Sequence, residues 1–195
     1  MMRLTSLILP ALIILASVLI ELIGTNSKSV LRFEHEFLVN NTYWQLITGH
    51  LVHLGLNHLL LNLVGFVLIW WLFLKTLPWH SWLVLFITSC LGVSLGLYWF
   101  NPNLSWYVGL SGILHGFFIY GICLNIALGY RYEWLLLVAI SGKLAWEQYV
   151  GPMPGSAEAA GGPVIVDAHL YGALTGLIIA CATYLPRYFI KGNLK

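Results

Sequence analysis

Six apolar stretches are long enough to cross a lipid bilayer, and they constrain the fold more than any other feature of the sequence. A bilayer-spanning helix needs about 20 predominantly apolar residues. Only 8% of the residues are charged, whereas soluble domains carry about 25%. We therefore predict an all-α polytopic membrane protein in which residues 1–195 form one domain. The expected transmembrane helices cover about 5–24, 51–74, 82–100, 110–129, 133–150 and 164–185.

Residues 25–49 differ from the rest of the chain, because charged side chains there are mixed with apolar ones. Such a mixture is typical of a segment that lies at the membrane surface. We predict an interfacial loop between the first and second helices.

The positions of Lys and Arg predict the orientation of the chain, since these residues gather in cytoplasmic loops. If the N-terminus is cytoplasmic, six of the nine basic residues face the cytoplasm, and only Lys28 and Arg32 fall on the other side. The six are Arg3, Lys75, Arg131, Arg187, Lys191 and Lys195. We therefore predict that both termini are cytoplasmic. The net charge of +2 gives no indication of a nucleic-acid partner.

Polar residues within membrane helices are costly, so they mark functional sites or helix contacts. Here they gather near the start of the second, fourth and sixth helices, which all begin on the outer side in the predicted topology. At 1.5 Å rise per residue, the three clusters reach roughly 5–15 Å below that surface. The pattern predicts one water-accessible cavity that opens to the outside. The residues concerned are His58 and Asn62, then Gly109, Ser111, Gly112 and His115, then His169, Gly172 and Gly176.

Glycines accompany two of these clusters. Gly172 and Gly176 follow His169 on one stripe of the sixth helix and form a small-xxx-small motif, which allows another helix to approach closely. Gly109 and Gly112 flank Ser111 in the same way. We expect this bare surface to bring the Ser111 hydroxyl within hydrogen-bond distance of His169.

A serine and a histidine at such a distance suit nucleophilic catalysis. A serine hydroxyl becomes a good nucleophile when a positioned base takes its proton, and histidine titrates in the right range. The Ser111 backbone N–H, His58 and Asn62 are candidate donors to the oxyanion of the reaction. Asp167 would point about 200° away from His169 around the helix. We therefore expect a Ser–His dyad without a carboxylate.

Other polar residues allow simpler interpretations. Lys143 and Glu147 lie four residues apart, and we interpret them as an ion pair within the fifth helix. His50 and His53 are expected to lie at the membrane interface or to contact loops. His115 either tunes His169 or satisfies a local polar contact, and the sequence leaves both possibilities open.

Three motifs, in order along the chain, resemble those of the rhomboid family. They are H-x-x-x-N at His58 and Asn62, G-x-S-G at 109–112, and A-H-x-x-G-x-x-x-G at 168–176. The resemblance implies a six-helix bundle that cleaves membrane-tethered proteins near their outer membrane boundary, in a bacterial inner membrane. By position, it implies that Ser111 is the nucleophile and His169 the base, and that His58 and Asn62 bind the oxyanion.

The chain departs from many rhomboid sequences in two places. Trp44-Gln45 stands where many members have Trp-Arg in the first loop. His115 stands where many bacterial members place an aromatic residue against the catalytic histidine. The segment Gly-Leu-Ser-Gly-x-Leu-His-Gly at 109–116 is similar to that of the rhombosortase branch. This similarity implies substrates that carry a C-terminal Gly-Gly motif, an apolar helix and a basic tail.

Three other classes of protein account for the sequence less well. A zinc protease is disfavoured because the motif H-E-x-x-H is absent from the sequence. A haem protein would explain paired histidines but not the motif around Ser111. A rhomboid-like protein that binds membrane helices without cleaving them would lack the catalytic residues. We predict no cofactor and no metal site.

Overall fold

The computed structural model describes residues 5–75 and 77–192, with side chains described for 7–75 and 77–184. Its elements are α1 (Thr5–Ile23), α2 (Thr25–Leu31), β1 (Phe33–Glu34), η1 (His35–Leu38), α3 (Gln45–Thr48), η2 (Gly49–Leu51), α4 (Leu56–Ile69), the π-helical turn η3 (Trp70–Leu74), α5 (Trp79–Phe100), β2 (Trp106–Tyr107), α6 (Ser111–Ala127), α7 (Glu133–Tyr149), α8 (Ser156–Ala160) and α9 (Val166–Gly192).

The prediction of a helical membrane protein is confirmed. In the described part of the chain, three helical segments have the length and composition to cross a membrane: Leu56–Leu74, Trp79–Phe100 and Val166–Tyr184. The segments Leu7–Ile23 and Ser111–Ala127 are shorter apolar helices. The number of six membrane spans therefore stays a prediction, although long helices occupy all six predicted stretches.

Two helix starts differ from the prediction. The second helix begins at Leu56 rather than near residue 51, because Gly49–Leu51 forms a short 3₁₀ turn and the chain is extended at Gly55. The third helix begins at Trp79 rather than near residue 82, directly after Pro78. Proline suits a helix start, since its fixed φ is helical and its missing N–H would have no partner there.

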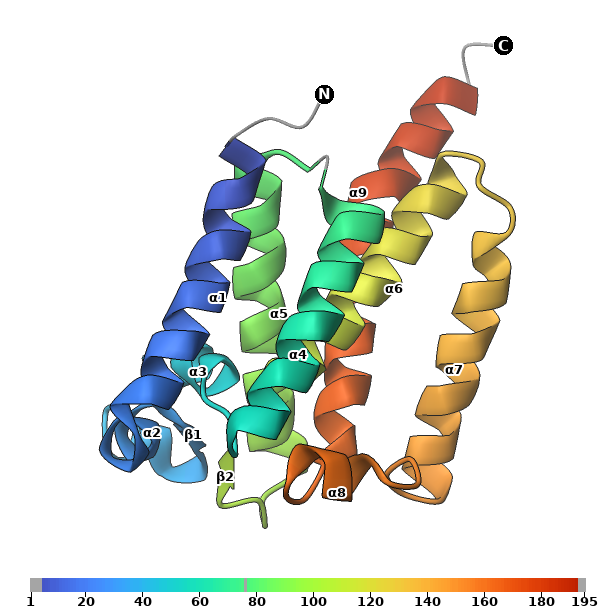
Figure 1. The fold of residues 1–195 in the computed structure, drawn as a ribbon. Helices are drawn as coiled ribbons and strands as arrows, with labels where there is room; N and C mark the ends of the chain where they lie inside the picture. Colours follow the sequence, from blue (N-terminus) through green and yellow to red (C-terminus); the bar gives the residue numbers. More distant parts are fainter. Residues whose placement is uncertain (1–4, 76, 193–195) are drawn as a thin grey trace.

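The long helices form a bundle whose two ends differ (Figure 1). The short elements α2, α3, β1, β2 and α8 gather at one end, which we call the loop end. α4, α6 and α9 all begin there, whereas α1 begins and α9 finishes at the opposite end. Figure 1 also places the α6–α7 connector, which contains Arg131, at that opposite end, away from α2 and its Lys28. Arg3 and Lys195 lie outside the described residues, as do the side chains of Arg187 and Lys191.

The loop between α1 and α4 is folded rather than extended. β1 pairs antiparallel with β2, so that Phe33 lies opposite Tyr107, and the Phe33 side chain is fully buried. Gln45 is also buried; its amide oxygen accepts from the Glu34 N–H at 3.2 Å and its amide nitrogen donates to the Val30 carbonyl at 3.2 Å. Gln45 therefore ties this loop together at the position where many rhomboid sequences have arginine.

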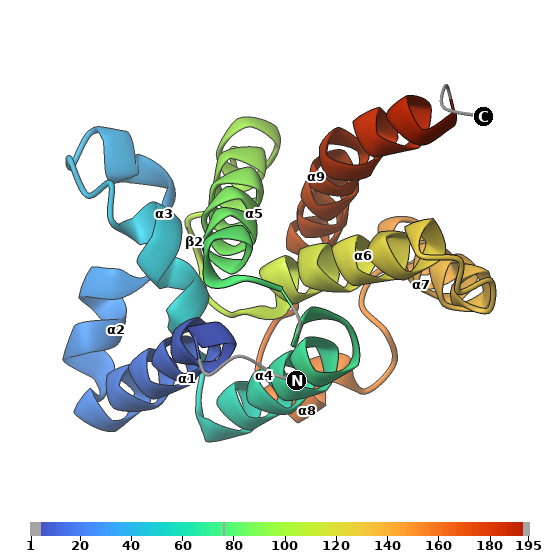
Figure 2. The ribbon, with the colours of Figure 1, turned by 90° about the horizontal axis from the view of Figure 1, so that it is seen from above.

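α6 lies in the middle of the bundle and packs against α4, α5, α7 and α9 (Figure 2). Its contact with α9 is the most extensive between any two helices in the described chain. Added Cβ atoms at Gly172 and Gly176 of α9 would overlap the Gly112 and Gly116 carbonyl groups of α6. The close approach predicted for Gly172 and Gly176 is thus observed. We call these four residues the glycine seam.

Candidate active site

Ser111 is the first residue of α6, and a glycine turn positions it. Gly109 has a φ of +118°, which L side chains rarely adopt, and its N–H donates to the Gly49 carbonyl at 3.1 Å. A Cβ at Gly109 would lie 2.7 Å from His58 Cε1. Only glycine fits both the backbone conformation and the space beside His58.

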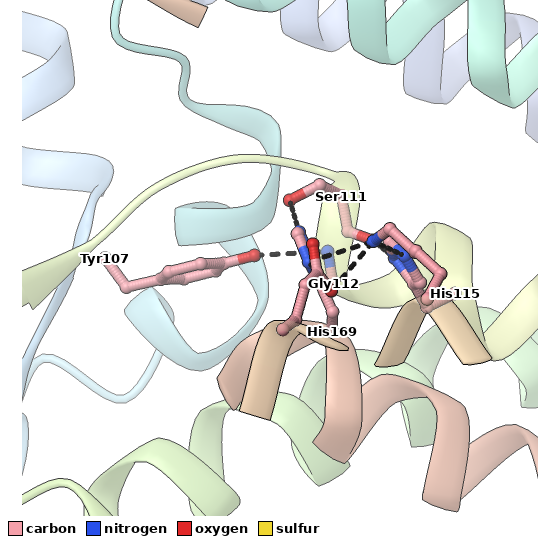
Figure 3. A network of polar contacts seen from close by, with 7 residues as sticks. Tyr107, Ser111, Gly112, His115 and His169 are labelled. Atoms are coloured by element: carbon pink, nitrogen blue, oxygen red, sulfur yellow. Dashed lines mark hydrogen bonds and ion pairs between the residues drawn. The ribbon is translucent and has the colours of Figure 1, made fainter. Parts of the chain in front are cut away.

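His169 lies opposite Ser111, one turn into α9. Its Nε2 is 3.1 Å from Ser111 Oγ, and only 5% of the residue is exposed (Figure 3). The glycine seam begins at Gly112, next to Ser111, so that the backbones of α6 and α9 are in close contact beside this pair. The contact predicted from the glycine spacing is present.

The other ring nitrogen of His169 faces two charged side chains from α7. Glu147 Oε2 is 3.0 Å from His169 Nδ1, and Lys143 Nζ is 3.4 Å from the same atom. Lys143 and Glu147 also form an ion pair at 2.8 Å. The expectation of a dyad without a neighbouring carboxylate was therefore wrong, and the pair on α7 does more than join two residues of one helix.

The correction has a physical reason in the sequence. Asp167 does point away from His169, and its carboxylate accepts a hydrogen bond from the Asn101 amide instead. Glu147 comes from another helix, 22 residues before His169, so proximity in the sequence does not reveal it. A charged residue within a helix predicted to span the membrane is costly, and this cost is the feature of the sequence that could have identified Glu147.

His115 lies one turn after Ser111 and joins the same network. Its Nδ1 donates to the Ser111 carbonyl at 2.7 Å, and its Nε2 accepts from Lys143 Nζ at 2.7 Å. We assign these roles from the network, because an ammonium group has donors only. Its ring stacks on His169 with centroids 4.1 Å apart.

Tyr107 of β2 supports the start of α6 from the other side. Its hydroxyl donates to the Gly109 carbonyl at 2.9 Å and accepts from the Gly112 N–H at 3.3 Å (Figure 3). One side chain thus bridges the residues on both sides of Ser111. Tyr107 was not singled out from the sequence, since nothing in a short loop strand marks such a contact.

His58 and Asn62, on α4, lie on one face as predicted. His58 Nδ1 accepts from the Leu54 N–H at 3.3 Å, so in the neutral ring Nε2 carries the proton. An added Cβ at Gly109 would be 3.0 Å from this Nε2. Asn62 is 5% exposed, and its amide nitrogen donates to the His58 carbonyl at 3.0 Å, which leaves a second N–H.

The two loop histidines make local contacts. His50 is fully buried and its Nε2 lies 3.1 Å from the Cys90 carbonyl and 3.0 Å from Ser94 Oγ. Burial lowers the pKa of His50 to about 4. His53 Nδ1 donates to the Leu51 carbonyl at 3.1 Å. The His50 contacts link the loop to α5, whereas the His53 contact stays within the loop.

Among the described residues, His115, Glu147 and His169 place possible metal-binding atoms within 4.8 Å of one another. Lys143 Nζ lies within 3.4 Å of an atom of each of the three. An ammonium at this point already supplies the positive charge that the carboxylate requires, and it would repel a metal ion. The three residues are suitable ligand types, but the ammonium among them disfavours a metal ion at this point.

A cavity of about 230 Å³ opens at the loop end. It is lined by residues 103–108 together with Leu54, Pro163 and Ile165. Tyr107 belongs both to this lining and to the hydrogen bonds around Ser111. Tyr107 therefore links the cavity to the start of α6, although neither Ser111 nor His169 lines it.

No curated protein sequence matches the chain. Residues 40–186 match the model of the rhomboid domain. This segment contains Ser111, His169 and Glu147 and spans more than half of the 195 residues. Rhomboid domains are generally those of intramembrane serine proteases, which act on membrane-helix substrates within the bilayer. The match and the apolar helices together place the chain in the rhomboid family of membrane proteins.

Proposed function

We propose that the protein is an intramembrane serine endopeptidase in which Ser111 attacks the scissile carbonyl and His169 acts as general base. The observation that carries the proposal is the 3.1 Å contact between Ser111 Oγ and His169 Nε2 in a buried site. A hydroxyl at this distance can pass its proton to the imidazole as it attacks. The histidine then returns that proton to the leaving amine, which leaves an acyl group on Ser111.

The tetrahedral intermediate needs donors for its oxyanion. The Ser111 N–H belongs to the first turn of α6, where backbone N–H groups have no partner within the helix. His58 Nε2–H lies beside Gly109, and Asn62 has a second amide N–H, so we assign these groups to the oxyanion as well. In serine proteases each such donor contributes about 3–4 kcal/mol.

The proposed substrates are proteins tethered by a membrane helix and cut near the outer membrane boundary. We assign the cavity at the loop end, which Tyr107 lines, to the unwound chain of the substrate. We place the loop end on the periplasmic side of a bacterial inner membrane, with both termini in the cytoplasm. The likeness of residues 109–116 to rhombosortases further assigns C-terminal Gly-Gly sorting tails of secreted proteins as substrates.

The activated serine is tested by labelling purified protein in lipid with a fluorophosphonate. We expect wild type to be labelled and the variants Ser111→Ala and His169→Ala to stay unlabelled. Ser141→Ala and His80→Ala, which change exposed residues of α7 and α5, serve as controls and should label as wild type does. Labelling that survives in Ser111→Ala would refute the assignment of the nucleophile.

The substrate class needs a separate experiment. A secreted reporter is fused to a Gly-Gly motif, an apolar helix and a basic tail, and is expressed together with the protein. We expect cleavage that requires Ser111 and that is lost when Gly-Gly is changed to Val-Val. Cleavage of both fusions alike would leave an endopeptidase without the sorting specificity. A folded wild type that neither labels nor cleaves would favour the alternative of a membrane-helix binder, and an absorption spectrum would test for haem.

A further inference from the structure

Glu147 is a buried carboxylate on α7, one of the six helices that the sequence predicts to span the membrane. Its exposed fraction is 3%, and its Oε2 lies 3.0 Å from His169 Nδ1 and 2.8 Å from Lys143 Nζ. An ionised group in such a place is retained only when it has partners. Both partners of Glu147 belong to the network around Ser111.

The proton on His169 must be on a particular nitrogen for the proposed reaction. To take the Ser111 proton, Nε2 has to be free of hydrogen. A neutral imidazole has a single N–H, so that N–H must be on Nδ1 and needs an acceptor. Glu147 Oε2, at 3.0 Å, is the acceptor in the structure.

Lys143 competes for the same nitrogen. Its Nζ is 3.4 Å from His169 Nδ1 and has donors only. If this ammonium donated to Nδ1, the ring proton would move to Nε2 and His169 could no longer accept from Ser111. In the structure the ammonium is held instead by Glu147 at 2.8 Å and His115 at 2.7 Å.

We propose that Glu147 is the positioning residue for His169, which makes the site a Ser–His–Glu arrangement whose carboxylate is shared with Lys143. The inference rests on the proposed function. Glu147 accepts from Nδ1–H, keeps Lys143 from donating there, and balances the positive charge that His169 gains when it takes the Ser111 proton. Without Glu147, the imidazolium would face the ammonium at 3.4 Å with no negative charge between them.

The test measures the rate of fluorophosphonate labelling of the full chain in lipid. Glu147→Gln keeps the shape of the side chain but removes its charge. We expect labelling to slow by ~10²–10⁴-fold, as when the acidic residue of a serine-protease triad is replaced by its amide. The matched control is Asp167→Asn, which removes the carboxylate closest to His169 in the sequence and should label within about twofold of wild type.

A double variant separates positioning from mere structural support. In Lys143→Met/Glu147→Gln no ammonium competes for Nδ1, so labelling should be at least about tenfold faster than in Glu147→Gln, while staying slower than wild type. A structural role predicts the reverse, since the second substitution removes a further contact. Size-exclusion elution reports folding. If Glu147→Gln fails to fold, Lys143→Met becomes the reference: the double variant should label more slowly than Lys143→Met, because only Lys143→Met keeps the acceptor for the Nδ1–H of His169, and equal rates would overturn the role of Glu147.

The outcomes are distinct. A wild type that labels, together with Glu147→Gln within about threefold of its rate, would overturn the role of Glu147 and leave the Ser–His chemistry intact. A double variant slower than Glu147→Gln, or equal to wild type, would overturn it too. Failure of the proposed function itself would show instead as a wild type without Ser111-dependent labelling.

Discussion

The ring of His115 stacks on the ring of His169, with the centroids 4.1 Å apart and the planes inclined by 19°. His115 also connects the Ser111 carbonyl to Lys143 through its two nitrogens. The stacked face of the His115 ring therefore restricts the rotation of the His169 ring. The Nε2 atom at its edge accepts a hydrogen bond from the Lys143 ammonium and holds it in place. An aromatic hydrocarbon ring could supply the first of these contacts but not the second.

Replacing His115 by phenylalanine separates these two contacts. In His115→Phe the stack is retained, whereas Lys143 loses an acceptor. Because a hydrogen bond to a charged group contributes about 1.5–3 kcal/mol, we expect fluorophosphonate labelling to slow by about tenfold or more. His80→Phe is the control. A rate equal to that of wild type at every pH tested would mean that the histidine edge has no part in the reaction.

A side chain in the glycine seam should separate α6 from α9. In Gly172→Ala the new Cβ would overlap the Gly112 carbonyl, so the helices must move apart. Overpacking of this kind costs about 1–3 kcal/mol, and we expect a lower thermal unfolding midpoint together with loss of labelling. Gly142→Ala is the control, since a Cβ there meets nothing within 4 Å. Unchanged labelling in Gly172→Ala would contradict the dependence of the Ser–His contact on the seam.

A side chain at Gly109 would be unfavourable for two reasons: the positive φ of the backbone and the contact with His58. Gly151 shares only the first of these, so comparing the two positions separates the effects. Gly151 has a comparable φ of +108°, but a Cβ there would have open space. Each substitution by alanine strains the backbone by about 1–3 kcal/mol. We expect Gly151→Ala to keep labelling and Gly109→Ala to lose it, because only the latter displaces His58. Equal labelling of the two variants would show that the contact with His58 is dispensable.

His50 makes stability depend on pH. Its pKa is about 4 when buried and 6.5 in a solvent-exposed reference. Between these values the unfolded loop binds a proton that the folded loop excludes, so stability is full above pH 6.5 and falls as the pH decreases towards 4. From pH 7 to 4.5 the loss due to His50 is on the order of 2 kcal/mol.

The variant His50→Asn tests this dependence. It should be less stable than wild type at pH 7, because the contacts to Cys90 and Ser94 are weakened. Its thermal midpoint should, however, fall less between pH 7 and 4.5 than that of wild type. Parallel falls in the two proteins would assign the acid sensitivity to other groups, such as His53, whose pKa burial lowers to about 3.

The sequence predicts much of this site because its determinants are periodic. Glycines at helical spacing near His169 predict a close helix contact, and the structure has it at Gly172 and Gly176. Gly116 of α6 also belongs to the seam, but the sequence does not predict this contact. The face of α6 that meets α9 depends on how the helices pack, which the spacing within one helix does not reveal. Glu147 was misjudged for the same reason: its partner lies 22 residues away in the sequence.

The glycine seam also sets how precisely the proposed nucleophile and base are placed. Their helices meet main chain against main chain, so the separation of the Ser111 and His169 backbones depends on rigid peptide units, whereas Glu147 and His115 hold the His169 ring. Side chains that line a groove can change rotamer to accommodate a substitution. Two glycine backbones in contact have no side chains that could adjust in this way. The helix-to-helix spacing at the site is therefore fixed by two stretches of main chain, and side chains from the rest of the bundle set only the orientation of the reacting groups.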